Sequence, residues 1–134
     1  MKIKYTNKRT LLTPKMLSGF FVDWPNHPDE KTHLKILRKS YMVWVALDGN
    51  KCVGFINALS DGVFYAYIPL LEVLPEYQGK GIGSKLLSNM LKSLNSMYAI
   101  DLVCDKSMAS FYESKNFEKK VGMIKRNYKN QAGS

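Results

Sequence analysis

The chain has 134 residues, of which 46% are hydrophobic and 23% are charged, the balance of a soluble globular protein with one core. A net charge of +9 favours anionic partners, but the basic residues are spread along the chain, which favours one anionic small-molecule site over a nucleic-acid groove. The apolar runs are too short to span a membrane and no signal peptide is visible, so we expect a cytoplasmic protein without a membrane partner.

The cysteines and histidines predict no metal site. Cys52 and Cys104 form no CxxC pair and cannot build a disulfide framework, so both are expected to be small buried hydrophobic residues. His27 and His33 match no metal-binding spacing. We therefore expect chemistry without a metal.

Turn and capping signals divide the first half of the chain into short elements. Residues 2–6 alternate in polarity and predict a first strand, and Thr13 before Pro14 marks the start of a first helix. A second helix is expected over residues 28–40. The β-rich runs on either side of Asp48-Gly49, a strong two-residue turn signal, predict a hairpin.

A long strand and an amphipathic helix follow in the second half. After a turn at residues 60–62 the strand runs to Pro75, and Pro69 within it indicates a sheet edge or a bulge. A helix begins at the glycine-rich turn that comes next. Its apolar face is formed by Ile82, Leu86, Met90 and Leu94.

Three further elements complete the predicted domain. We expect a buried parallel strand at residues 98–104, a short helix at residues 106–117 and a last strand at residues 118–128. The order βααβββαβαβ predicts a single-domain α/β fold, a mixed β-sheet flanked by helices. The domain should span residues 1–129, and residues 130–134 are expected to form a disordered tail.

The motif QGKGIG, residues 78–83, places three alternate glycines between a strand and a helix. Glycines let a backbone approach an anion, and the free N–H groups of the first helical turn point at it. The Walker A spacing fails because Lys80 precedes Gly81, and the dinucleotide pattern fails because Ser84 takes the place of its last glycine. Packing of strand against helix explains one or two glycines, so three favour a phosphate cradle.

The stretch LEVLPEYQGKGIGSKLL, with FYESKNF some 30 residues later, resembles the GNAT superfamily of acetyl-CoA-dependent N-acetyltransferases, whose element order also matches. The resemblance implies that the turn holds the diphosphate of coenzyme A, with Gln78 ordering the turn and Lys80 adding charge. It also implies two parallel strands that splay at a bulge, where the cofactor arm pairs with one strand's backbone. The cofactor-binding residues would be Leu71, Val73, Gln78, Gly79, Lys80, Gly81, Ile82, Gly83 and Ser84.

The resemblance also implies how the thioester reacts. An amine attacks the acetyl group and expels a thiolate, so the site needs a neutral amine, an oxyanion donor and a proton for the thiolate. The backbone N–H near Val73 would be the oxyanion donor. Tyr112 in FYESKNF would be the general acid, because a phenol stays protonated at neutral pH.

The general base is left open. Glu72 is the candidate, although strand alternation points it away from the face of its neighbours unless a bulge intervenes. Tyr67 and Asp61 are alternatives, and a water relay can replace any single base. A ping-pong route through Cys104 would need an activating base that the sequence does not display.

Two departures from the family pattern concern other parts of the site. Asp105 stands where relatives often have Asn, which affects a usual cofactor or substrate contact. Lys115-Asn116 replaces the common Leu-Gly, but Asn tolerates the left-handed conformation that such a helix end requires.

Aromatic residues dominate the places where the fold would receive its acceptor. Phe21, Trp24, Tyr65 and Tyr67 predict a small-molecule primary amine with an apolar body, held partly by cation–π contact. Alternatives are an acetyltransferase for protein or peptide amines, and a module of the same fold that binds acetyl-CoA without turnover. A nucleic-acid partner is not expected, and the oligomeric state, a homodimer included, is left open.

Overall fold

The computed structural model describes residues 2–133 and contains one five-stranded sheet in the order β1-β2-β3-β4-β5. The strands are β1 (Lys4–Thr6), β2 (Met42–Asp48), β3 (Lys51–Ser60), β4 (Tyr65–Val73) and β5 (Ala99–Asp101). Neighbours from β1 to β4 are antiparallel, whereas β5 pairs parallel with β4. The mixed α/β fold predicted from the sequence is thereby confirmed.

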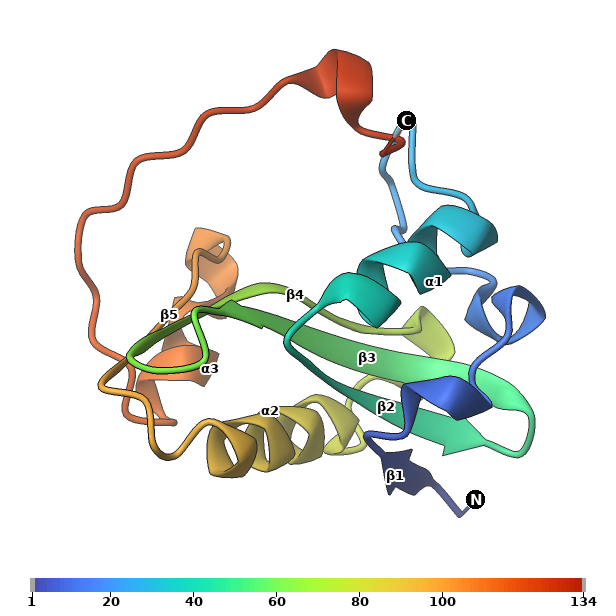
Figure 1. The fold of residues 1–134 in the computed structure, drawn as a ribbon, viewed down its shortest axis with the longest axis horizontal. Coiled ribbons are helices and arrows are strands. Elements are labelled where there is room, and N and C mark those ends of the chain that lie inside the picture. Colours follow the sequence, from blue (N-terminus) through green and yellow to red (C-terminus); the bar gives the residue numbers. More distant parts are fainter. Residues whose placement is uncertain (1, 134) are drawn as a thin grey trace.

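Helices cover both faces of this sheet (Figure 1). On one face, a Cβ added to Gly54 would lie 3.1 Å from Leu86 of α2 (Ile82–Ser93). On the other face, the Phe55 ring lies 4.5 Å from His33 of α1 (Glu30–Lys39). Since consecutive strand residues point to opposite faces, the two helices sandwich β3.

The helix after the glycine turn packs as its spacing predicted. The four residues expected on its apolar face are all buried: Ile82, Leu86, Met90 and Leu94. Because α2 lies directly on β3, it approaches the sheet where Gly54 leaves room for it.

β4 carries the irregularity that Pro69 indicated. Asn57 of β3 faces Leu70, but Leu59 faces Tyr67, so β4 contains one more residue than β3 over this stretch. This bulge lies where β4 parts from β5, because their pairing ends at Tyr67 and Asp101. Beyond that point the two parallel strands diverge.

Several predicted elements are shorter than expected. The first helix is only the 3-10 turn Pro14–Leu17, because Gly19 takes a left-handed φ of 92° directly after it. The hairpin turn lies one residue later than predicted, since Asp48 pairs with Lys51. The strand expected at residues 98–104 ends at Asp101.

Cys104 is exposed as a consequence, and the prediction that it is buried was wrong, whereas Cys52 is buried. The chain continues through the 3-10 turn Lys106–Met108 into α3 (Ala109–Glu113). Asn116 then adopts a left-handed φ of 70°, the conformation predicted for this helix end.

The last predicted strand is not paired in this chain, and that prediction was wrong. Residues 118–126 form no backbone–backbone hydrogen bond with any residue between 2 and 133, because the segment runs clear of the sheet (Figure 1). It rejoins the body at the 3-10 turn Tyr128–Asn130, beyond which the Asn26 N–H donates to Gln131 Oε1 at 3.0 Å. Of the expected disordered tail, Ser134 lies outside the described residues.

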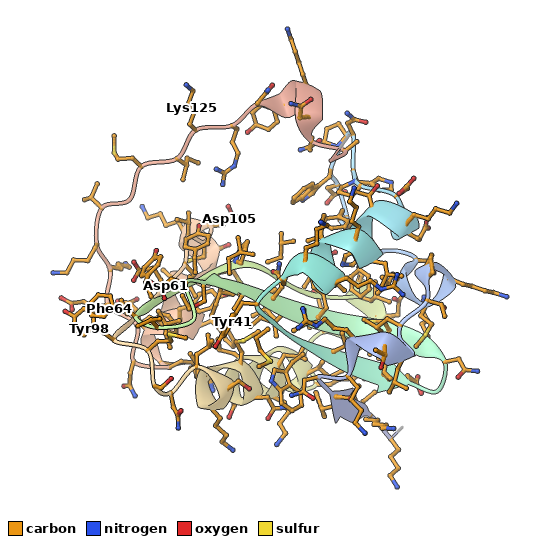
Figure 2. The ribbon with its side chains drawn as sticks, viewed as in Figure 1. Tyr41, Asp61, Phe64, Tyr98, Asp105 and Lys125 are labelled. Atoms are coloured by element: carbon orange, nitrogen blue, oxygen red, sulfur yellow. The ribbon has the colours of Figure 1, made fainter. Side chains whose placement is uncertain are left out.

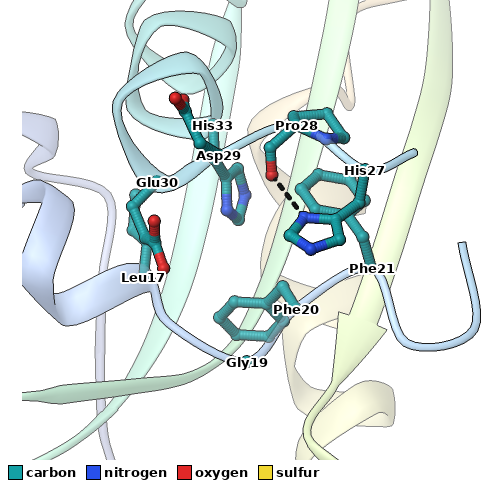
Figure 3. Close-up of a pocket in the computed structure, with 9 residues that line it drawn as sticks. All are labelled: Leu17, Gly19, Phe20, Phe21, His27, Pro28, Asp29, Glu30 and His33. Carbon is teal, nitrogen blue, oxygen red and sulfur yellow. Dashed lines mark hydrogen bonds between the residues drawn. The ribbon is translucent and has the colours of Figure 1, made fainter. Parts of the chain in front are cut away.

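A histidine is buried between α1 and the sheet without polar partners. His33 is 1% exposed, and neither ring nitrogen forms a hydrogen bond. Its ring is surrounded by aromatic rings and borders a cavity of about 10 Å³ (Figure 3), room for one water molecule at most. Burial lowers the pKa of His33 to about 4, so the ring is neutral at pH 7.

Candidate active site

The glycine turn between β4 and α2 has a row of free backbone donors. Gly79 and Gly81 adopt left-handed φ values of 76° and 84°, and Gly81 is the N-cap of α2. An added Cβ at either position would meet no atom within 4 Å, so conformation rather than crowding requires glycine. Within residues 2–133, no protein atom accepts a hydrogen bond from the N–H groups of residues 79–84.

These donors lie at the positive end of the α2 dipole, where an anion is stabilised. The Gln78 side chain fixes the turn from the strand side, since its Nε2 donates to Val73 O at 2.9 Å. Lys80 is exposed on the turn and adds a positive charge. The surroundings suit a diphosphate, which needs several converging N–H donors and a nearby cation.

The edge of β4 beside the turn is also free. The Leu74 N–H donates to Val53 O at 2.9 Å, toward β3. Because N–H directions alternate along a strand, the N–H groups of Val73 and Leu71 point the opposite way, to the side that β5 has left. An extended amide-containing molecule can pair with this edge, so the residues present fit a coenzyme A arm.

Tyr112 lies on α3 with its ring in the core and its hydroxyl still reaching solvent. It is 9% exposed, and the ring packs edge-on against Phe111 and Phe117. The hydroxyl forms no hydrogen bond and is not among the fully enclosed polar atoms. Burial, with a smaller contribution from nearby Cys104, raises the pKa of Tyr112 to about 12, so the phenol keeps its proton.

Glu72 of β4 contacts the loop that joins the 3-10 turn Pro14–Leu17 to α1. Both of its carboxylate oxygens accept the Phe21 N–H at 2.9 Å, and Oε2 also accepts the Val22 N–H at 3.4 Å. The loop is tightly bent, with left-handed φ values at Phe21 (61°) and Asp23 (68°). Burial raises the pKa of Glu72, although these N–H donors partly oppose it.

The aromatic residues predicted for the acceptor differ in exposure. Trp24 is 39% exposed and Tyr65 38%, and Tyr67 is half-buried. Phe21 is 3% exposed and packs behind Trp24, with ring centroids 4.9 Å apart and ring planes tilted by 54°, so it can support a wall but offers little surface.

Asp61, an alternative base, caps its own turn. Its Oδ1 accepts the N–H groups of Val63 and Phe64 at 2.8 Å each, and these bonds lower the pKa of its carboxyl. A carboxylate stabilised in its charged form is a weak proton acceptor.

Two features of this site could not be seen in the sequence. The bond from Gln78 to Val73 spans a turn whose path the sequence does not determine, and Glu72 contacts a loop 51 residues earlier in the chain.

No group of three His, Cys, Asp or Glu side chains with metal-binding geometry occurs between residues 2 and 133. Over the same range, no helix combines the length and apolar character of a membrane span.

The family model of the acetyltransferase (GNAT) domain matches residues 39–119, more than half of the chain. The chain belongs to the GNAT family. The matched region contains β2 to β5, the glycine turn and α3, so it includes the free donors, the splayed strands and Tyr112. Membership rests on this match and on the fold described above.

Similar proteins agree with this assignment. The crystal structure of a candidate acetyltransferase from Deinococcus radiodurans R1 is 38% identical, with a TM-score of 0.95 over 97% of this chain and 92% of that one. An uncharacterized N-acetyltransferase of Pyropia yezoensis, ycf52, is 32% identical over 78% of this chain. A chloroplastic GCN5-related N-acetyltransferase of Arabidopsis thaliana is 31% identical over 72%. The chain spans 59% of the Pyropia protein and 46% of the Arabidopsis protein.

Proposed function

We propose that this GNAT protein transfers an acetyl group from acetyl-CoA to the primary amine of a small molecule, by direct attack in a ternary complex. The observation that carries the proposal is the set of unpartnered N–H groups of residues 79–84, next to a strand edge left free by the divergence of β4 and β5. Together they favour a ligand with a diphosphate and an amide-rich arm.

In this proposal the turn and the strand edge hold acetyl-CoA. The N–H groups of residues 79–84 and the Lys80 ammonium bind the diphosphate, while the edge at Leu71 and Val73 pairs with the arm. When bound, acetyl-CoA supplies an activated thioester. The chain's own contribution is a fixed N–H dipole at Val73, which costs no reorganisation when negative charge develops near it.

Tyr112 would act on the leaving group. With its pKa at about 12, the phenol is protonated at every working pH. Complete proton transfer to a thiolate with a pKa of about 8.5 would be uphill by roughly 5 kcal/mol. Tyr112 therefore serves best as a hydrogen-bond donor to the departing sulfur, and the proton is then supplied from solvent.

Glu72 remains the candidate base, but its contacts favour a second role. Both oxygens already accept the Phe21 N–H, so the carboxylate holds the loop that contains Phe21 in its strained shape. We call this loop the acceptor loop. A water relay then takes the amine proton. The two roles have different kinetic consequences, because a base acts in the transition state and a positioning residue acts mainly on acceptor binding.

The acceptor site combines exposed aromatic surface with few acids. Trp24 and Tyr65 offer π faces to a single ammonium or ring-bearing amine, and nearby carboxylates are too few to balance a polyamine. A peptide or protein amine is the alternative acceptor. A cytoplasmic location is part of the same proposal.

Thiol release from acetyl-CoA across a panel of amines tests the proposal. The panel would contain arylalkylamines, amino-acid amides, spermidine, kanamycin and a short peptide at equal concentration. We expect an arylalkylamine or amino-acid amide to give the highest kcat/KM. Preference of tenfold or more for spermidine, kanamycin or the peptide would contradict the acceptor class, and acetyl-CoA binding without turnover of any amine would indicate a non-catalytic module.

A further inference from the structure

The chain ends in a short turn that lies against the acceptor loop. Residues 118–127, which we call the C-terminal arm, are all exposed, and Lys125 within the arm points away from the body (Figure 2). Gln131 and Ala132, by contrast, are half-buried. The chain therefore returns to the body at residues 131–133, which we call the C-terminal turn, beside the loop that precedes α1 (Figure 1).

Two contacts hold the C-terminal turn in place. Gln131 Oε1 accepts the Asn26 N–H at 3.0 Å. Gly133 takes a left-handed φ of 80°, and a Cβ added there would lie 2.8 Å from Cγ2 of Thr32 on α1. Carbon atoms that are not bonded do not approach this closely without a clash, so glycine is what lets the turn lie against α1.

The acceptor loop is bonded to distant parts of the chain on both sides of Trp24. On one side, the Glu72 carboxylate of β4 accepts the Phe21 N–H at 2.9 Å. On the other side, Gln131 accepts the Asn26 N–H. Between these two bonds the loop also turns back on itself, because the Trp24 N–H donates to Phe21 O at 3.1 Å. The wall that carries Trp24 is therefore held by β4 at one end and by the C-terminal turn at the other.

The part of the loop around Trp24 has little other support. Residues 22–27 are all exposed, and Asp23 adopts a left-handed φ of 68°, a strained conformation for a residue other than glycine. Within residues 2–133, Gln131 provides the only side-chain hydrogen bond to residues 23–26. A strained and exposed segment keeps its shape only where neighbouring structure holds it, so this bond should decide how well the segment is ordered.

We propose that Gln131 is a positioning residue for the acceptor: it holds the Asn26 end of the acceptor loop and thereby keeps Trp24 in place to contact the amine. Its role is indirect, because it acts through the backbone of the loop. The arm then serves as the connection that brings the C-terminal turn from α3 to this loop. The inference rests on the proposed function, since it takes Trp24 to be part of the acceptor site.

Four substitutions in or beside the C-terminal turn separate this role from general damage. Gln131→Ala removes the acceptor of the Asn26 N–H, and Gly133→Ala forces the turn away from Thr32 without touching that hydrogen bond directly. Gln131→Glu is the conservative variant, because a carboxylate oxygen also accepts an N–H. Asn130→Ala is the matched control, since the Asn130 side chain forms no hydrogen bond with any residue between 2 and 133.

Steady-state kinetics with 2-phenylethylamine and acetyl-CoA measure the effect on the full chain. In Gln131→Ala and Gly133→Ala, KM for the amine should rise by about threefold to tenfold, the effect of one neutral hydrogen bond. The value of kcat and the Kd for acetyl-CoA should stay within about twofold, because neither the glycine turn nor Tyr112 is touched. Gln131→Glu and Asn130→Ala should behave as wild type. An unchanged KM in Gln131→Ala, or an equal rise in Asn130→Ala, would overturn the proposal.

A second measurement needs no turnover. The chain has two tryptophans, so its ¹H–¹⁵N spectrum has two indole signals, whose heteronuclear NOE reports motion on the ps–ns timescale. The NOE of Trp24 should fall in Gln131→Ala, whereas that of Trp44, whose Nε1 donates to Ser93 Oγ at 2.9 Å, should not change. An equally ordered Trp24 in wild type and variant would overturn the inference. A mobile Trp24 in a protein that acetylates no amine would contradict the proposed function alone.

Discussion

Two regions of this molecule leave backbone groups without protein partners, and their shapes differ. At residues 79–84 the free N–H groups gather in one turn at the start of α2, held by left-handed glycines. In residues 118–127, the C-terminal arm, N–H and C=O groups are spread along an extended chain and alternate in direction. Converging donors suit an anion, whereas alternating donors and acceptors suit another strand. The first region should therefore govern cofactor binding, and the second should not take part in it.

The largest expected effect compares two tyrosine hydroxyls, one on α3 and one at residue 128. Tyr112→Phe should lower kcat by about 10²–10³-fold, because its hydroxyl donates a hydrogen bond to the departing sulfur in the transition state. Tyr128→Phe, at the far end of the arm, should leave kcat unchanged. Steady-state and single-turnover kinetics measure both variants, and an unchanged kcat for Tyr112→Phe with chemistry limiting would remove Tyr112 from the mechanism.

Acid should destabilise the folded domain, and the buried His33 should contribute to this loss. Its pKa is about 4 in the folded protein and about 6.5 when unfolded, so its contribution to stability is complete above pH 6.5 and is lost as pH falls toward 4. The loss amounts to about 3 kcal/mol. Urea unfolding between pH 7 and pH 4 should therefore show a smaller loss for His33→Phe, and equal losses in wild type and variant would contradict the assignment.

Substitution of two glycines can distinguish the loss of a ligand-binding site from the effect of backbone strain alone. Gly81→Val and Gly49→Val both place a branched residue at a left-handed position with no atom within 4 Å of the new Cβ. Both should lose about 1–3 kcal/mol of stability. Only Gly81→Val should raise the Kd for acetyl-CoA, by about tenfold or more, which is 1.4 kcal/mol. Calorimetric titration that finds the same affinity in both variants would contradict the cradle.

A smaller effect is expected when Glu72, which holds the acceptor loop, is replaced. Glu72→Gln keeps one oxygen to accept the Phe21 N–H, so the free energy of unfolding should fall by about 1 kcal/mol. KM for the amine should rise by roughly tenfold at most, with little change in kcat. A fall in kcat of a hundredfold or more at unchanged KM would instead identify Glu72 as the general base.

The smallest expected effect is that of substitutions in the arm on the affinity for acetyl-CoA. Val121→Asp combined with Met123→Asp should leave the Kd for acetyl-CoA within about twofold, because the arm forms no part of the turn or the β4 edge. Isothermal titration of the double variant provides the value. A tenfold loss would mean that the arm contributes to cofactor binding.

The sequence predicted the parts of the fold that rest on local chemistry. The apolar spacing of α2, the turn at Asp48-Gly49 to within one residue, and the bulge at Pro69 all follow from short-range rules. The left-handed Asn116 follows in the same way. These features depend on neighbours that lie close in the chain.

What the sequence did not predict depends on distant contacts. The alternating residues 118–128 predicted a last strand wrongly, because no backbone partner for residues 118–126 lies between residues 2 and 133. Cys104 was expected to be buried because the apolar run continues past Asp101, yet pairing stops where β5 leaves β4. The contact of Glu72 with the Phe21 N–H closes over 51 residues and has no local signal.

The central claim, that the free N–H groups of the glycine turn bind the diphosphate of acetyl-CoA, can be tested in one titration. Amide ¹H–¹⁵N spectra would be recorded as coenzyme A is added to the labelled protein, with pantetheine as the ligand that lacks the diphosphate. We expect the largest shifts at the amides of residues 79–84 with coenzyme A only, and none in residues 118–127. Equal shifts with both ligands, or shifts that leave the turn unaffected, would contradict the account.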